Sequence, residues 1–148
     1  MIPGVGGDSD NMYEVELLRK LRKRFKIAIL LFRGASGLPI TSAKLCGPSS
    51  WEDVREGIEY VSKNYCFDPK TDQKRCRYYA YACSMGAAML VLYLINDNLK
   101  AAKNLDGAAL YGTMWDYHKG QTKYYHGYGG WPEYLVVMNL VRMTRQHQ

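Results

Sequence analysis

The sequence predicts an α/β fold, in which helices cover both faces of a parallel sheet, in a single domain of 148 residues. Three observations lead to this prediction. Short apolar runs alternate with helical patterns along the chain, and such alternation gives right-handed crossovers between parallel strands. A serine stands between a strand-like run and a helix-like run, with no room for a loop. A chain of this length buries about 68% of its unfolded surface, enough for one core.

The chain begins with a glycine-rich loop over residues 2–10, followed by a helix and a strand. The loop lacks a lysine followed by serine or threonine, which excludes a Walker-type phosphate loop. Apolar residues at helical spacing predict an amphipathic helix over residues 11–24. Its cations contribute to the formal net charge of +6, and we interpret them as a solvated face, with an anionic membrane surface as the alternative. Residues 26–32 are expected to form a strand buried on both faces of the sheet.

A second helix and a second strand follow. Ser50 resembles an N-cap, and Asp53 is the carboxylate three residues later, so a capping box is expected to open a helix at residue 51. Residues 68–72 form a polar turn, and residues 77–82 form the strand that leads to the central serine. Core spacing places these side chains on one face of the helix: Trp51, Val54, Ile58 and Val61.

Residues 82–86 read Ala-Cys-Ser-Met-Gly and are typical of a nucleophile elbow. In the Gly-x-Ser-x-Gly form of this motif, a sharp and strained turn lifts the serine Oγ clear of the sheet. The flanking residues must be small because the strand and the helix approach closely. Ala82, in place of the first glycine, adds only a methyl group, so the motif predicts Ser84 as the candidate nucleophile.

The remaining elements complete the predicted sheet. A helix is expected from residue 85 to about residue 96, and a further buried strand over residues 105–111. Arg33, Ser84 and Gly112 then follow the carboxyl ends of strands, where parallel sheets bind their ligands.

The last part of the chain departs from the alternating pattern. Residues 112–130 are rich in Gly, Tyr and His, whereas residues 131–148 are predicted to form one amphipathic helix. We therefore divide the domain into core strands and helices over residues 1–112 and a cap-like segment over residues 113–148.

In order along the chain, these motifs resemble the α/β-hydrolase fold, in the YheT-type branch of abhydrolase-domain lipases and phospholipases. Leu31 and Ala82 differ from the asparagine and the glycine usual in that family. Four segments carry the resemblance: residues 3–7 to the oxyanion loop, 29–37 with Thr41 to the Asn-x-Arg-Gly-x-x-Gly signature, 53–55 to the aspartate-led helix, and 82–86 with 93–94 to the elbow and the Tyr-Leu after it.

The resemblance implies hydrolysis of carboxylic esters or lipids, of the acylglycerol or phospholipid type, through an acyl-enzyme. Ser84 would be the nucleophile, and the backbone N–H groups of Met85 and Val5 would form the oxyanion hole. No cofactor is implied. Because the family's acid and histidine follow later strands, we expect a partial α/β-hydrolase domain, truncated at both ends, with a C-terminal cap-like helix.

Three histidines are candidates for the catalytic base. His118 follows Asp116 and the last predicted strand, whereas His126 lies among glycines and tyrosines and His147 lies at the chain end. Without a base, a serine is a poor nucleophile. The alternative is therefore a catalytically inactive subunit with a binding or structural role, in which a partner chain covers the edge of the incomplete sheet.

Other function classes find less support. No His and Cys spacing indicates a metal site, and we interpret the tyrosines near Lys119 and Lys123 as a cap or partner surface, not a nucleic-acid site. No apolar run approaches the roughly 18 residues of a membrane span. Without a recognisable signal peptide, we expect a cytoplasmic protein or a peripheral membrane contact, not secretion. The cysteines are expected to be reduced and partly buried: Cys46, Cys66, Cys76 and Cys83.

Overall fold

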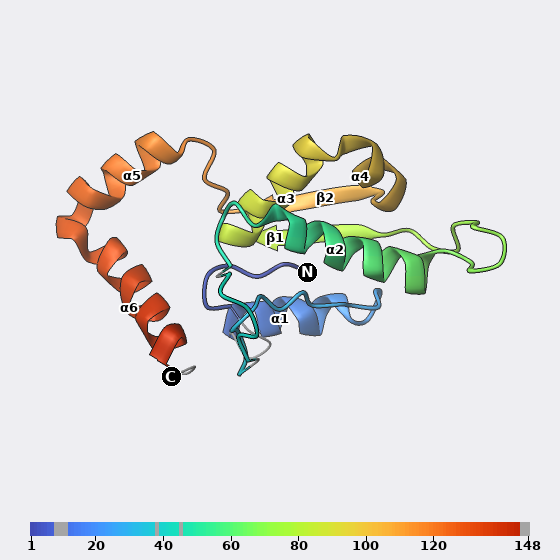
Figure 1. Ribbon diagram of the computed structural model, residues 1–148, viewed down its shortest axis with the longest axis horizontal. Coiled ribbons are helices and arrows are strands. Elements are labelled where there is room, and N and C mark those ends of the chain that lie inside the picture. Colours follow the sequence, from blue (N-terminus) through green and yellow to red (C-terminus); the bar gives the residue numbers. More distant parts are fainter. Residues whose placement is uncertain (8–11, 38, 45, 146–148) are drawn as a thin grey trace.

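The computed structural model describes residues 1–7, 12–37, 39–44 and 46–145. Within these ranges the protein is a mixed α/β structure with a small parallel sheet (Figure 1). Its elements in chain order are α1 (Met12–Leu21), α2 (Trp51–Val61), the π-helical turn η1 (Ser62–Cys66), β1 (Tyr79–Cys83), α3 (Met85–Asn96), α4 (Asn98–Asn104), β2 (Gly107–Tyr111), α5 (Tyr117–His126), the 3-10 turn η2 (Gly127–Gly130) and α6 (Trp131–Arg145).

The sheet is built around β1. This strand pairs in parallel with β2, so that Cys83 at its end lies opposite Tyr111. On its other side Ile2 forms a parallel bridge to Ala82, where the Ile2 N–H donates to the Tyr81 oxygen at 2.8 Å and the Cys83 N–H donates to the Ile2 oxygen at 3.0 Å. The amino-terminal residues therefore extend the sheet beside the strand that leads to Ser84.

The strand expected over residues 26–32 is not formed as a regular strand. The Met1 amino group donates to the Ala28 oxygen at 2.7 Å, and the Leu30 N–H donates to the Met1 oxygen at 2.9 Å. This segment thus adds to the open side of residues 1–2. Only Phe32 is buried, because the segment lies at the margin of the sheet and not within it.

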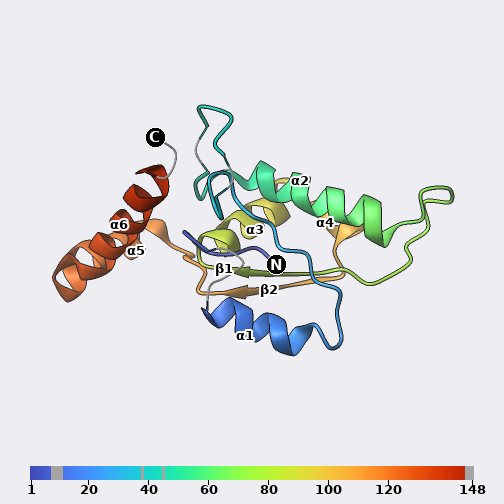
Figure 2. The same cartoon turned by 90° about the horizontal axis from the view of Figure 1, so that it is seen from below.

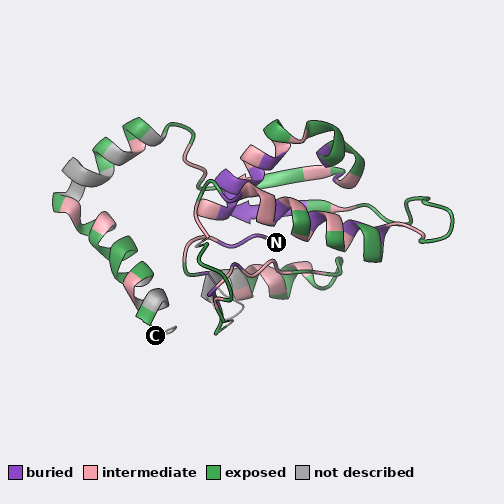
Figure 3. Cartoon of the chain, in the orientation of Figure 1, coloured by how far each residue is buried: buried purple, intermediate pink, exposed green. Residues whose placement is uncertain are grey.

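The strand expected over residues 105–111 is present in a shorter form, but it is not buried. β2 exposes Ala108, Ala109 and Tyr111 (Figure 3). The reason is its place in the sheet: β2 pairs with β1 alone, and no described strand covers its outer edge. The prediction of a buried strand was wrong on this point.

Helices lie on both sides of the sheet (Figure 2), with α1 on one side and α2, α3 and α4 on the other. α3 forms the centre of the core, since Met89, Leu90 and Tyr93 are all 0% exposed. α2 packs beside it through Val54 and Ile58, as the core spacing predicted. The bounds predicted for α3 are confirmed.

The capping box expected at Ser50 is wrong. The Ser50 hydroxyl accepts a hydrogen bond from the Gly47 N–H at 3.1 Å and makes no cap bond to α2. Asp53 also faces elsewhere, because its carboxylate binds Arg33. The helix still begins at the expected residue, since its acidic first turn and its apolar face do not depend on the box.

The region after β2 holds more helix than its composition predicted. α5 occupies part of the stretch rich in Gly, Tyr and His, and it begins where the Asp116 carboxylate accepts the Lys119 N–H at 3.0 Å, an N-cap contact. η2 joins α5 to α6, and the three form an arm that extends away from the sheet (Figure 1). α6 ends at Arg145, and residues 146–148 lie outside the described ranges.

None of the helices in the described ranges combines the length and the apolar composition needed to cross a membrane.

Candidate active site

Ser84 lies at the apex of a tight turn between β1 and α3. Its backbone has φ 52° and ψ −119°, a region that costs a residue with a side chain about 1–3 kcal/mol. The residue is exposed, although Ala82 and Cys83 before it and Gly86 after it are buried. The strained backbone and the exposed hydroxyl are the two properties expected of a nucleophile elbow.

Hydrogen bonds from three directions hold the turn. The Ser84 N–H donates to the Tyr111 oxygen at 2.8 Å, and the Cys83 N–H donates to the Ile2 oxygen at 3.0 Å. The Ser84 carbonyl accepts the first bond of α3, from the Ala88 N–H at 3.1 Å. These bonds stabilise a conformation that the serine alone would not adopt.

The small residues of the motif are required by close packing. A Cβ on Gly86 would lie 2.3 Å from the Pro3 oxygen and 2.8 Å from the Ile2 oxygen, both of them backbone atoms. Ala82, on the strand side, is 0% exposed. The sequence prediction that flanking side chains must be small is thus explained by the amino-terminal segment, which passes directly over the start of α3.

The glycine-rich loop of residues 3–7 lies against Ser84. A Cβ on Gly4 would be 3.0 Å from the Ser84 Cβ and 3.6 Å from its Oγ. The Gly7 N–H donates to the Gly4 oxygen at 3.0 Å and closes the turn, while Gly6 has a φ of 67° that favours glycine. Two segments that are distant in sequence therefore meet at the serine.

The three residues predicted from sequence to act together take these positions. Ser84 is the turn itself, Met85 is the first residue of α3, and Val5 follows Gly4 in the turn of the glycine-rich loop. A helix N-terminus leaves its first N–H groups without partners inside the helix and favours negative charge. The start of α3 and the glycine-rich loop thus both place backbone atoms beside Ser84.

Within the part of the chain that the structure describes, no histidine lies at this position. His118 is exposed at the start of α5, in the arm that extends away from the sheet (Figure 1). The neighbouring Asp116 pairs with Lys119 at 3.2 Å, and hydrogen bonds from Lys119 hold the pKa of its carboxyl below the usual value. The side chain of His126 and all of His147 lie outside what the structure describes. Among the described side chains, none hydrogen-bonds the Ser84 hydroxyl.

An ion pair that motif spacing did not predict links the loop after residue 32 to α2. The Arg33 guanidinium contacts the Asp53 carboxylate through Nε at 3.1 Å and through a terminal nitrogen at 2.6 Å. Both side chains are half-buried. Burial and, secondarily, the nearby Asp53 charge raise the pKa of the Cys46 thiol to about 11, whereas Arg33 acts in the opposite direction. Arg33 and Asp53 both belong to segments that carry the family resemblance.

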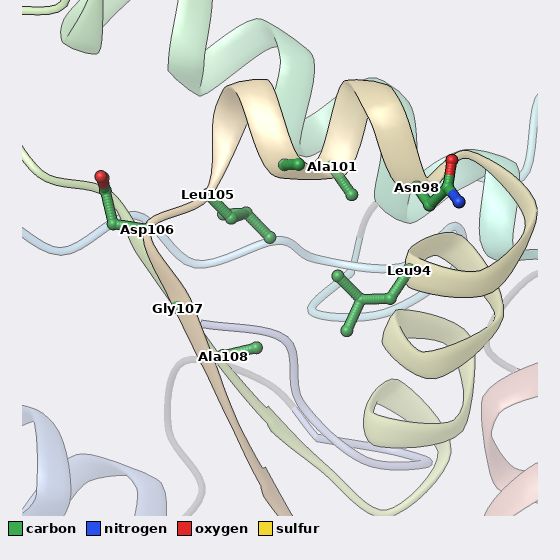
Figure 4. Close-up of a pocket in the computed structure, with 8 residues that line it drawn as sticks. Leu94, Asn98, Ala101, Leu105, Asp106, Gly107 and Ala108 are labelled. Carbon is green, nitrogen blue, oxygen red and sulfur yellow. The ribbon is translucent and has the colours of Figure 1, made fainter.

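A shallow groove of about 320 Å³ lies elsewhere, between α3, α4 and β2 (Figure 4). Its lining is small and apolar, with Leu94, Ala101, Leu105 and Ala108 among its residues. Neither Ser84 nor the loop of residues 3–7 contributes to it. The groove follows the open side of β2 and is therefore a feature of the sheet edge, not of the serine.

In the described part of the chain, no group of three or more His, Cys, Asp and Glu side chains is arranged to hold a metal ion. Comparisons of the chain with protein-family models, curated proteins and solved structures found no match.

Proposed function

We propose that the protein is a serine hydrolase of the α/β-hydrolase type that acts on carboxylic esters or lipids, of the acylglycerol or phospholipid type, through an acyl-enzyme. One observation carries the proposal: Ser84 is exposed on a strained strand-to-helix turn with φ 52° and ψ −119°. A backbone of this kind persists only where the surroundings impose it, and such strain is found mainly at functional sites.

In this proposal the Ser84 Oγ attacks the carbonyl carbon of an ester, and the carbonyl oxygen becomes an oxyanion. The N–H of Met85, at the start of α3, and the N–H of Val5, in the loop beside the serine, stabilise that charge. A Cβ on Gly4 would lie 3.6 Å from the Ser84 Oγ, so the loop that carries Val5 passes close to the reacting atom, which supports this assignment. The alcohol leaves, and water then hydrolyses the acyl-serine.

The attack releases a proton, and the described side chains offer no base hydrogen-bonded to Ser84. The proposal therefore requires a histidine that this part of the chain does not supply, oriented by a carboxylate. In the same proposal, the arm of α5 and α6 is the cap-like segment. Its exposed apolar residues suit a lipid or membrane surface, among them Trp131, Tyr134, Leu135 and Val137.

A second candidate is an inactive relative that serves as a binding or structural subunit. The open edge of β2 favours it, because exposed strand edges pair readily with another chain. β2 reads Gly-Ala-Ala-Leu-Tyr and carries neither a charge nor a proline to discourage such pairing. The apolar groove beside it would accept side chains of a partner strand.

A fluorophosphonate probe separates the two candidates, since it reacts covalently with an activated serine. Labelling that is lost in Ser84→Ala supports the hydrolase. A folded protein whose Ser84 does not react is the result expected of the inactive subunit.

A further inference from the structure

Cys66 and Cys76 lie together, although their separation in sequence matches no common cysteine motif. Phe67 and Lys74 pair as an antiparallel bridge, and the Arg75 N–H donates to the Cys66 oxygen at 2.7 Å. The Cys76 thiol lies 3.8 Å from the Tyr65 oxygen. Burial and, secondarily, the neighbouring Cys76 raise the pKa of the Cys66 thiol. A short hairpin over residues 67–75 thus brings Cys76 back beside Cys66.

Contacts on both arms hold this hairpin in place. Lys74 pairs with Asp106 at 2.6 Å, at the start of β2, and Lys103 of α4 pairs with Asp72 at 3.2 Å. The Lys103 ammonium also lies 5.5 Å from the centre of the Phe67 ring. The hairpin is therefore held at the amino ends of β1 and β2, the opposite end of the strands from the turn at Ser84 (Figure 1).

The two thiols differ in access. Cys76 is exposed, whereas Cys66 is only 4% exposed. A reagent in solution can reach Cys76 first, and Cys66 is then placed to attack the modified sulfur. Two exposed arginines flank Cys76: Arg75 is ion-paired with Asp68, whereas Arg77 has no ion pair among the described residues. The positive charge of Arg77 therefore favours an anionic reagent.

We propose that Cys66 and Cys76 form a thiol–disulfide exchange site that reacts with small anionic disulfides and closes a Cys66–Cys76 bond. The Cys76 thiolate attacks one sulfur of the reagent, its S–S bond breaks, and the leaving thiolate takes a proton from water. The Cys66 thiolate then attacks the Cys76 sulfur and releases the second thiol. The two cysteines are oxidised, and the reagent disulfide is reduced to two thiols.

Cys66 is the resolving thiol, because it is buried whereas Cys76 is exposed. Burial, together with the adjacent Cys76, raises the pKa of Cys66 to about 11, so little thiolate is present at neutral pH. A mixed disulfide at Cys76 therefore forms first and is then resolved. The closed bond would fasten the hairpin to the end of η1, and it requires nothing of Ser84.

Oxidised glutathione tests the site on the whole chain without any substitution. The expected product has an intact mass lower by two hydrogen atoms, carries no glutathione, and yields a cross-linked peptide that joins Cys66 to Cys76. A lasting glutathione adduct as the end product, a dimer linked through Cys76, or a cross-link between another pair would overturn the proposal.

Two variants and one control sharpen the result. Cys66→Ser should stop at a stable glutathione adduct on Cys76, and Cys76→Ser should form neither an adduct on this pair nor a cross-link. Cys46→Ser should behave as the unchanged protein.

Cystamine, a cationic disulfide, should react more slowly than oxidised glutathione at low salt, and added salt should reduce this difference in rate. Equal rates at low salt would refute the preference for anionic reagents.

Discussion

The backbone N–H of Ser84 donates a hydrogen bond to the carbonyl oxygen of Tyr111 at 2.8 Å. This bond ties the strained turn to the end of β2, while Ile2 binds the residue before the turn from the other side. The serine is thus held between two neighbours of β1. Its conformation is a property of the sheet, and changes in those neighbours should affect it.

Gly86→Ala should destabilise the fold. Its Cβ would lie 2.3 Å from the Pro3 oxygen and 2.8 Å from the Ile2 oxygen, and backbone atoms cannot move aside as a flexible side chain can. We expect a loss of about 1–3 kcal/mol in the free energy of unfolding, measured by urea denaturation.

Gly47→Ala is the matched control for Gly86→Ala, because a Cβ there meets nothing within 4 Å. It should change the free energy of unfolding by less than about 0.5 kcal/mol. Equal losses in the two variants would show that the amino-terminal segment does not pack over α3 as described.

Gly4→Ala should slow the reaction of Ser84 more than it affects stability. The added Cβ would lie 3.0 Å from the Ser84 Cβ and displace either the loop or the serine. Because small displacements at a reacting centre cost much of the rate, we expect fluorophosphonate labelling to slow by at least about tenfold. Gly47→Ala should label at the unchanged rate, and a Gly4→Ala protein that did the same would remove the loop from the site.

The Arg33–Asp53 pair should show coupling in a double-mutant cycle. Arg33→Met and Asp53→Asn each leave the other, half-buried side chain charged but without its oppositely charged partner. The coupling energy should therefore be about 1 kcal/mol in the free energy of unfolding. Lys20→Met with Glu16→Gln is the control pair, since these atoms are 3.8 Å apart and both side chains are mostly exposed. Coupling there should be at most about 0.5 kcal/mol. Similar values in both cycles would mean that the Arg33–Asp53 contact does not anchor the loop.

Acid should weaken the contact between the hairpin and β2. The Lys74 ammonium and the Tyr78 N–H lower the pKa of Asp106 below 3.8. A lowered carboxyl pKa stabilises the folded state fully above the unfolded value, and this contribution is lost as the pH falls through the folded value. Asp106→Asn should therefore show a smaller fall in urea midpoint than the unchanged protein between about pH 5 and about pH 3. An unchanged fall would contradict the pairing.

The sequence predicts the elements whose pattern lies in adjacent residues, and it does not predict features that depend on distant segments. The elbow and α3 were predicted because the apolar strand, the small flanks and the apolar helix are adjacent in sequence. The exposure of β2 was not predicted, since an Ala-rich run is the same whether or not a further strand covers it. The pattern of residues 26–32 is likewise apolar, yet it lies at the margin of the sheet.

Local sequence patterns also did not predict the contacts between distant segments. Asp53 fitted a capping box, but its carboxylate binds Arg33 from another segment. Asp116 could have predicted the start of α5, because it acts as the N-cap. The abundance of glycine and tyrosine nearby instead favoured an irregular segment. The proximity of Cys66 and Cys76 depends on a hairpin whose bridge joins Phe67 to Lys74, and no cysteine spacing indicates it.

Fluorophosphonate labelling of the whole protein, with the modified residue located by peptide mapping, tests the proposed function most directly. We predict labelling at Ser84 that is abolished in Ser84→Ala and retained in Ser36→Ala, because Ser36 is a second exposed serine with a positive φ of 53°. Folding of each protein is checked by its urea midpoint. Absence of labelling at Ser84 in the folded protein, or equal labelling of Ser36, would contradict the assignment of Ser84 as an activated nucleophile.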